Sequence, residues 1–253
     1  MLTFSLQSGS NGNSIYVEAD GVRLLFDAGI SGRQAELRAN RHGRTLFGVD
    51  ALFISHDHHD HVACAGVFHR RFGVPIHINE ATYRIACRRM GPVHDVRHFV
   101  SGDTVEIGAV RVHTVPTPHD AADGVAFVIE HGGRRLGILT DLGHPFAGLN
   151  DLLSDLDAAY LESNYDPRML EAGPYPDDLK RRITGRGGHL SNAEGAALAR
   201  PHLGGRLRWI AAAHLSGENN HPEIALRAHR EAYGPDFPIF VTRRDRESEI
   251  MTV

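Results

Sequence analysis

The stretch Ser55 to Ala63, SHDHHDHVA, constrains the fold of this 253-residue chain more than any other. It concentrates four side chains of the metal-binding type within a few residues, namely His56, His58, Asp60 and His61. Imidazole nitrogens and carboxylate oxygens bind zinc, manganese or iron. Because one ion would accept all four only with strain, the spacing favours two metal ions. His59, which lies among them, is expected to face away and not to bind.

The flanking segments place these side chains on a loop between a strand and a helix. Val49 to Ser55 is a short apolar run of strand type. Val62 to Gly73 has a helical pattern that ends at the glycine. On a loop at the end of a strand, His56 and His58 can point to one metal position, and Asp60 and His61 to a second. The alternative is a solvated polar loop in a chain with 18 histidines, and it fits this context less well.

Composition indicates an ordinary globular protein, with 42% apolar and 23% charged residues, and the length suits one domain over residues 1–253. No signal peptide or membrane-length apolar run is evident. Cys64 and Cys87 fall in helical patterns, so we expect buried free thiols and a reducing, cytoplasmic location. The net charge of −4 does not by itself indicate a nucleic-acid-binding protein.

Strand-type and helical patterns alternate along the chain. Strands are expected at residues 1–6, 15–18, 22–26, 74–78, 96–100, 104–107, 109–115, 125–131, 134–139, 158–161 and 208–213. Helices are expected at residues 31–40, 79–90 and 148–155, and Asn79 is a typical cap of the second. The loop Ser8 to Ser14 is either a plain turn or an oxyanion-binding loop, in which Ser8 and Asn11 would contact substrate.

The pattern His-x-His-x-Asp-His after a strand resembles the signature of the metallo-β-lactamase fold superfamily. The resemblance implies an α/β fold, an αββα sandwich of two mixed sheets flanked by helices. His119, at a strand end beside two prolines, would complete the first set of ligands. Asp141, which follows an apolar strand, would bridge two ions. Asp27 would orient the metal loop from behind without binding an ion.

Narrower motifs follow in order: ESN, GPYP, GHLSN and HLSGENN, between Glu162 and Asn220. Together they resemble the YycJ-like (WalJ) branch of the superfamily, with ribonuclease Z a more distant relative. That branch implies a metal-dependent DNA exonuclease. Tyr165 stands where a histidine is expected in the branch, which puts substrate preference in doubt but leaves the metal ligands unchanged.

The resemblance assigns roles to the remaining residues. His56, His58 and His119 would bind one ion, and Asp60, His61 and His214 the other. A hydroxide bridging the ions would be the nucleophile, with Asp60 counted among the catalytic groups. His189, on a glycine-rich loop before a helix capped by Ser191 or Asn192, would donate a proton to the leaving alkoxide.

A basic cluster precedes His189. Arginine side chains suit phosphate oxygens, so the cluster could bind a nucleic-acid backbone, and a solvated helix face is the equal alternative. Its members are Lys180, Arg181, Arg182 and Arg186.

The sequence therefore favours a dinuclear zinc or manganese phosphodiesterase, specifically a DNA exonuclease with nucleic acid as its partner. One alternative is a small-molecule metallohydrolase of the same fold, acting on cyclic phosphodiesters, thioesters or lactones. A second is a regulatory metal-binding protein without turnover. The sequence leaves the metal and the oligomeric state open, a homodimer included.

Overall fold

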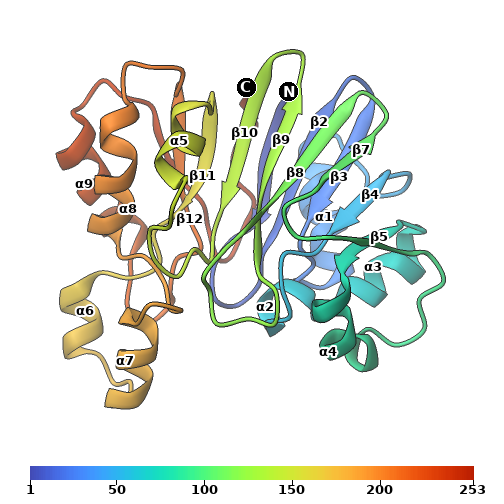
Figure 1. Ribbon diagram of the computed structural model, residues 1–253, viewed down its shortest axis with the longest axis horizontal. Helices are drawn as coiled ribbons and strands as arrows, with labels where there is room; N and C mark the ends of the chain where they lie inside the picture. Colours follow the sequence, from blue (N-terminus) through green and yellow to red (C-terminus); the bar gives the residue numbers. More distant parts are fainter.

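Two seven-stranded sheets packed face to face form the centre of the molecule, with helices on both outer faces (Figure 1). The computed structural model describes residues 1–253. This arrangement confirms the expected αββα sandwich.

The first sheet is built largely from the N-terminal half of the chain. Its strands, in spatial order, are β14 (Met251–Thr252), β1 (Leu2–Gln7), β2 (Ser14–Ala19), β3 (Val22–Phe26), β4 (Ala51–Phe53), β5 (Ile76–Asn79) and β6 (Val96–Phe99). From β3 to β6 the strands are parallel, so their carboxyl ends lie at the same edge of the sheet.

The second sheet also has seven strands, parallel in one half and antiparallel in the other. Its order is β13 (Ile239–Val241), β12 (Trp209–Ala213), β11 (Ala158–Glu162), β10 (Arg134–Leu139), β9 (Val125–His131), β8 (Val110–Pro116) and β7 (Thr104–Ile107). The strands from β10 to β13 are parallel. The expected hairpin around Gly132 and Gly133 joins β9 to β10 and is confirmed.

Three apolar layers hold the sandwich together. Between the sheets, Phe127 of the second sheet contacts Phe26 and Phe53 of the first, at ring-centroid distances of 5.1 and 5.9 Å. Two more clusters lie between each sheet and its helices. In β3, Leu24 and Phe26 face the other sheet while Leu25 faces the helices. Central strands are thus buried on both faces, which explains their nearly continuous apolar sequences.

Each outer face has its own set of helices (Figure 1). The first sheet carries α1 (Gly32–Arg41), α3 (Ala65–Phe72) and α4 (Glu80–Met90), after the short α2 (His59–Val62). The second carries α5 (Leu149–Ser154), α8 (Asn192–Ala199), the 3-10 turn Arg200–His202 and α9 (Pro222–Tyr233). Two helices project beyond this layer at the lower left of the view, α6 (Pro167–Ala172) and α7 (Asp177–Thr184).

Helix caps agree with the sequence at three places. The side chains of Ser31 and Asn79 accept hydrogen bonds from backbone N–H groups at the starts of α1 and α4. Ser191 caps α8 in a reciprocal pair with Glu194. The cap predicted at Asn79 is confirmed, and of the alternatives Ser191 and Asn192 it is Ser191 that caps α8, while Ser31, expected as the first residue of a helix, is the cap of α1.

Three details differ from the sequence-based expectations. The helix expected from Val62 to Gly73 is interrupted between α2 and α3, because the first turn positions Asp60 and His61 and the second packs on the sheet. The edge strands β13 and β14 had not been predicted, since short strands carry little periodic signal, and helices α6 and α9 had not been predicted either. Cys64 and Cys87 are free thiols, as expected, but both are only half-buried.

No helix has the length and apolar character needed to cross a membrane.

Candidate metal centre

The candidate site lies where strand ends from both sheets converge. The first sheet supplies the loop after β4, and the second supplies residues after β8, β10 and β12 and the end of β11. Because the strands that carry these loops are parallel within each sheet, their carboxyl ends meet at one end of the sandwich. This end is at the bottom of Figure 1, near α2.

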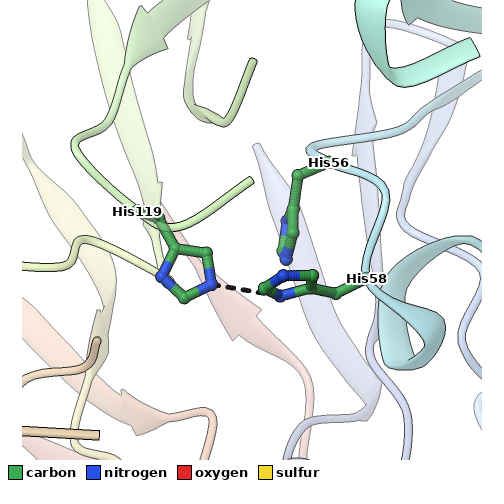
Figure 2. A group of neighbouring side chains, drawn as sticks. All are labelled: His56, His58 and His119. Carbon is green, nitrogen blue, oxygen red and sulfur yellow. Dashed lines mark hydrogen bonds between the residues drawn. The ribbon is translucent and has the colours of Figure 1, made fainter. Parts of the chain in front are cut away.

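The first group of side chains consists of His56, His58 and His119 (Figure 2). Nε2 of His119 lies 3.2 Å from Nδ1 of His58. The other nitrogen of His119, Nδ1, donates to the carbonyl of Gly188 at 2.9 Å, which leaves Nε2 free to bind an ion. Nδ1 of His56 donates to Ser55 Oγ at 2.9 Å, and Nε2 of His56 is buried without a partner.

The second group consists of Asp60, His61 and His214. Oδ2 of Asp60 lies 3.1 Å from Nε2 of His214 and 3.4 Å from Nε2 of His61. Behind them, Nδ1 of His61 donates to Oδ2 of Asp27 at 2.8 Å. Asp27 also accepts the backbone N–H and the hydroxyl of Ser55. Asp27 therefore fixes the ring of His61 and the start of the metal loop together.

Asp141 lies between the two groups. Its carboxylate oxygens are buried and make no hydrogen bond. Imidazole nitrogens of His61, His119 and His214 approach them to 3.3, 3.6 and 3.3 Å. An isolated buried carboxylate is costly unless it is paired or binds a metal. The unpartnered oxygens of Asp141 and the free Nε2 of His56 therefore fit divalent ions, and the donor atoms within each group lie within 4.8 Å of one another.

Three of these residues have a left-handed backbone. Asp27, Asp141 and His214 have φ values of 63°, 56° and 60°. Each follows the end of a strand, namely β3, β10 and β12. Residues other than glycine adopt this conformation at a cost, and such residues cluster at functional sites. These turns occur at the strand ends where the cluster of metal-type side chains lies.

Burial and charge set the protonation of the cluster. Burial lowers the pKa of His56 well below its usual value, which favours the neutral form that binds metals. Burial would raise the pKa of Asp141, but the imidazoles of His214 and His61 outweigh it and hold that pKa well below the usual range. The carboxylate is therefore ionised, which is the form that can bind a metal ion.

Glu162 is a site residue to which sequence reasoning gave no role. It is fully buried at the end of β11, and Oε1 accepts a hydrogen bond from Nδ1 of His189 at 2.7 Å. Oε2 accepts the backbone N–H groups of Leu142 and Leu190. Burial would raise the pKa of Glu162, but His189 outweighs it and lowers the pKa. The signal that indicated Asp141 was a carboxylate at the end of an apolar strand. Glu162 ends the apolar strand β11 in the same way, so this signal would also have indicated Glu162.

A pocket of about 340 Å³ opens onto this cluster. His58, Asp60, Asp141, His189 and His214 line it, so the pocket and the metal-type side chains coincide. His59 also lines the pocket, whereas we had expected it to face away. It belongs to none of the groups of metal-type donors, in keeping with the expectation that it does not bind an ion.

The expected substrate-binding residues are scattered around the pocket. Arg182 lines it and pairs with Asp120 through a 2.6 Å contact. Lys180 lies outside and donates to the carbonyl of Glu171, and Arg181 and Arg186 are exposed.

The loop Ser8 to Ser14 presents a different residue from those expected. Ser8 is buried, and its hydroxyl accepts the backbone N–H of His214 at 2.8 Å. Asn11 donates to the carbonyl of Arg244, away from the pocket, and Ser10 lines the pocket instead. The loop therefore supports His214 and offers Ser10 to a ligand.

Two other residues, Tyr165 and His144, do not line the pocket. Tyr165 is 5% exposed and does not line it, so the departure from the branch pattern is at a supporting position. His144 makes no hydrogen bond with the metal-type side chains. Its Nδ1 donates to the carbonyl of Arg186 at 2.5 Å.

Comparison with known proteins agrees with this fold and site. The family model described as the metallo-beta-lactamase superfamily matches residues 8–186. Exodeoxyribonuclease YycJ of Bacillus anthracis is 32% identical over 222 residues, 87% of this chain and 84% of that protein. Exodeoxyribonuclease WalJ of Streptococcus pneumoniae is 31% identical over 259 residues, 98% of this chain and 96% of that protein.

The solved structures add a fold comparison. The metallo-beta-lactamase fold protein YhfI from Bacillus subtilis has a TM-score of 0.73 at 16% identity, covering 98% of this chain and all of that one. This chain belongs to the metallo-β-lactamase superfamily and is a hydrolase of that fold, which implies divalent metal binding. Within the superfamily it is similar to the proteins named YycJ and WalJ over most of its length.

Proposed function

We propose that this chain is a dinuclear metal-dependent phosphodiesterase and acts as a DNA exonuclease. The observation that carries the proposal is the buried, unpartnered carboxylate of Asp141 between two groups of imidazole and carboxylate donors. Two relatives named exodeoxyribonuclease match most of the chain and support the choice of DNA as substrate.

In this proposal His56, His58 and His119 hold one ion, Asp60, His61 and His214 hold the other, and Asp141 contacts both. When bound, the ions would supply an activated water and neutralise charge on the phosphoryl group. The residues behind the ligands determine which atoms are available. Gly188 and Asp27 accept the Nδ1 protons of His119 and His61, so the Nε2 atoms of both rings keep their lone pairs.

His189 is the proposed proton donor. Its Nδ1–H donates to the carboxylate of Glu162 at 2.7 Å, so Nε2 is the nitrogen that this contact leaves for a substrate. His189 lines the pocket together with Asp141, so a leaving oxygen bound there would be within reach of its ring. A histidine held in this way gives its Nε2 proton to the leaving alkoxide and is then restored by solvent.

One observation favours the small-molecule alternative. The pocket is small, and Arg182, the basic residue that lines it, is already paired with Asp120. A closed pocket without a basic groove would suit a cyclic phosphodiester or a thioester. Arg181 and Arg186 are exposed close to Arg182 in sequence and supply the cationic surface that a strand of DNA requires.

Digestion of end-labelled single- and double-stranded DNA and RNA tests the proposal. The protein is loaded with manganese or zinc, and its metal content is measured. The Asp60→Ala/His61→Ala variant, prepared in the same way, controls for contaminating nucleases. Stepwise shortening of DNA by the wild type alone is the expected result.

No cleavage of any nucleic acid at confirmed occupancy by two ions would overturn the exonuclease proposal and direct attention to cyclic nucleotides and thioesters. The cytoplasmic location and the oligomeric state remain predictions. The two free thiols suit a reducing compartment.

A further inference from the structure

Helix α7 has an apolar face that does not pack into the core. None of its residues is buried. Leu179 and Ile183 are spaced four residues apart on α7, the separation that places side chains on one side of a helix, and Tyr175 lies two residues before the helix begins. An amphipathic helix normally buries such a face, so this one needs another contact.

That face borders the pocket of the candidate metal centre. Tyr175, Leu179 and Ile183 are the three hydrophobic residues among the 15 that line it. The remaining lining residues are polar or glycine and include the side chains of the proposed metal ligands. The pocket therefore has an apolar wall, formed by Tyr175, Leu179 and Ile183, and a polar wall that contains the proposed metal ligands.

The apolar wall is fixed relative to the catalytic side chains. The backbone N–H of His189 donates to the carbonyl of Ile183 at 2.9 Å, directly after the last turn of α7. A Cβ atom on Gly188 would lie 2.0 Å from that same carbonyl, so this close approach requires glycine. Arg182 ties the helix to Asp120, the neighbour of His119. The wall is thus held at both the His189 loop and the His119 loop.

We propose that the apolar face of α7 binds the terminal nucleobase of a DNA strand whose last phosphodiester lies at the metal ligands. This inference rests on the proposed exonuclease function. A nucleotide has an anionic phosphate and a flat, largely apolar base. The wall of metal ligands suits the phosphate, and the apolar wall suits the base. Bases stack on aromatic side chains with little regard to sequence, as a nuclease that trims any strand requires.

The size of the pocket agrees with a single terminal nucleotide. Its volume of about 340 Å³ is near the lower end of ligand clefts, which run from roughly 300 to 1,000 Å³. Tyr175 is only partly buried and lines the pocket, so part of its ring surface is accessible to a ligand. The face therefore recognises the end of a strand rather than its sequence.

The test uses two single-stranded oligonucleotides that differ in one group. One carries a normal base on its terminal nucleotide, and the other carries an abasic tetrahydrofuran residue there, with each end of the strand examined in turn. KM and kcat are measured for the metal-loaded wild type, for Tyr175→Ala and for Ile183→Ser. Ile85→Ser is the matched control, because Ile85 is an exposed isoleucine on α4, outside the pocket.

We expect Tyr175→Ala to raise KM for the base-bearing strand about tenfold, which is within the range found for loss of one base–aromatic stack. The wild type should show a similar rise on the abasic strand, and Tyr175→Ala should no longer distinguish the two strands. Ile183→Ser should act in the same direction, and Ile85→Ser should match the wild type. Metal content and thermal unfolding temperature report whether each variant is intact.

Two results would overturn the inference, and they can be told apart from failure of the proposed function. If the wild type degrades both strands with the same KM, α7 does not bind the base although the protein is an exonuclease. If Tyr175→Ala, intact and metal-loaded, raises KM equally on both strands, the effect is not stacking. If the wild type degrades neither strand, the exonuclease proposal fails and the inference fails with it.

Discussion

Single side chains at strand ends determine the chemistry available to this site. Asp27, Asp141 and His214 each adopt a left-handed backbone, and Glu162 ends a buried strand. The strands β3, β10, β11 and β12 bring these four polar groups to the site, and each group makes its own contacts there. Replacing one such group should therefore change one property of the site and not its whole architecture.

Glu162→Gln keeps the size of the side chain but removes the charge that holds His189. We expect kcat to fall by roughly 10²- to 10⁴-fold, the usual contribution of general acid–base catalysis, with little change in KM. Metal content should stay at the wild-type level. The matched control is Glu171→Gln, at an exposed glutamate on α6 outside the pocket. Loss of bound metal in Glu162→Gln would instead show that Glu162 is a ligand.

Asp27→Asn tests the support of the metal loop. Asparagine tolerates the left-handed backbone, so the turn should persist while His61 loses its anionic acceptor. We expect metal affinity to fall about 10- to 100-fold, as is typical when such a partner is lost. The metal affinity is measured by competition with a chelator. Asp20→Asn, at another aspartate with positive φ but in the turn between β2 and β3, should keep the wild-type affinity.

At the scale of elements, helix α9 is joined to the site through a buried polar contact. His229 is fully buried, and its Nε2 lies 3.0 Å from Oγ of Ser163, the residue after Glu162. Its Nδ1 lies 3.0 Å from the hydroxyl of Tyr233. Burial lowers the pKa of His229 to about 4. The neutral ring is therefore part of the folded state.

This pKa predicts a loss of stability in acid. The folded pKa of about 4 is below the unfolded value of about 6.5, so the contribution is complete above pH 6.5 and is lost as the pH falls towards 4. The loss from this one group is on the order of 3 kcal/mol. Urea unfolding at pH 7, 5 and 4 should show a steeper decline for the wild type than for His229→Gln.

The control for this measurement is His94→Gln, at an exposed histidine, which should keep the wild-type slope. Identical slopes for the wild type and His229→Gln would contradict the prediction.

At the scale of the whole molecule, the apolar layers and the site contribute to stability separately. The clusters between the sheets and under the helices hold the sandwich together without any of the metal-type side chains. An ion that binds only the folded state adds stability according to its affinity and concentration. Removal of metal should thus lower stability without unfolding the chain.

Dialysis against a chelator should leave the far-ultraviolet circular dichroism unchanged and lower the thermal unfolding temperature by several degrees. Adding zinc or manganese should restore it in a concentration-dependent way. The Asp60→Ala/His61→Ala variant should show no such response to metal. Loss of secondary structure on chelation would contradict this view and would show that the ions are needed for folding.

The sequence by itself indicated most of the elements and the side chains expected at the candidate site. Strand ends with polar residues, helix caps and the spacing of His56, His58, Asp60 and His61 are local features, and local features can be read from neighbours along the chain. The short edge strands were missed because two or three residues carry almost no periodic signal.

Only the tertiary structure decided which distant residues act together. Glu162 meets His189 because β11 and the loop before α8 end at the same edge, and Ser8 supports His214 because the first loop packs on the end of β12. The apolar face of α7 has a helical spacing like any core helix, and its position beside the pocket is what leaves it uncovered. Such pairings depend on how the two sheets pack, and packing is a property of the whole chain.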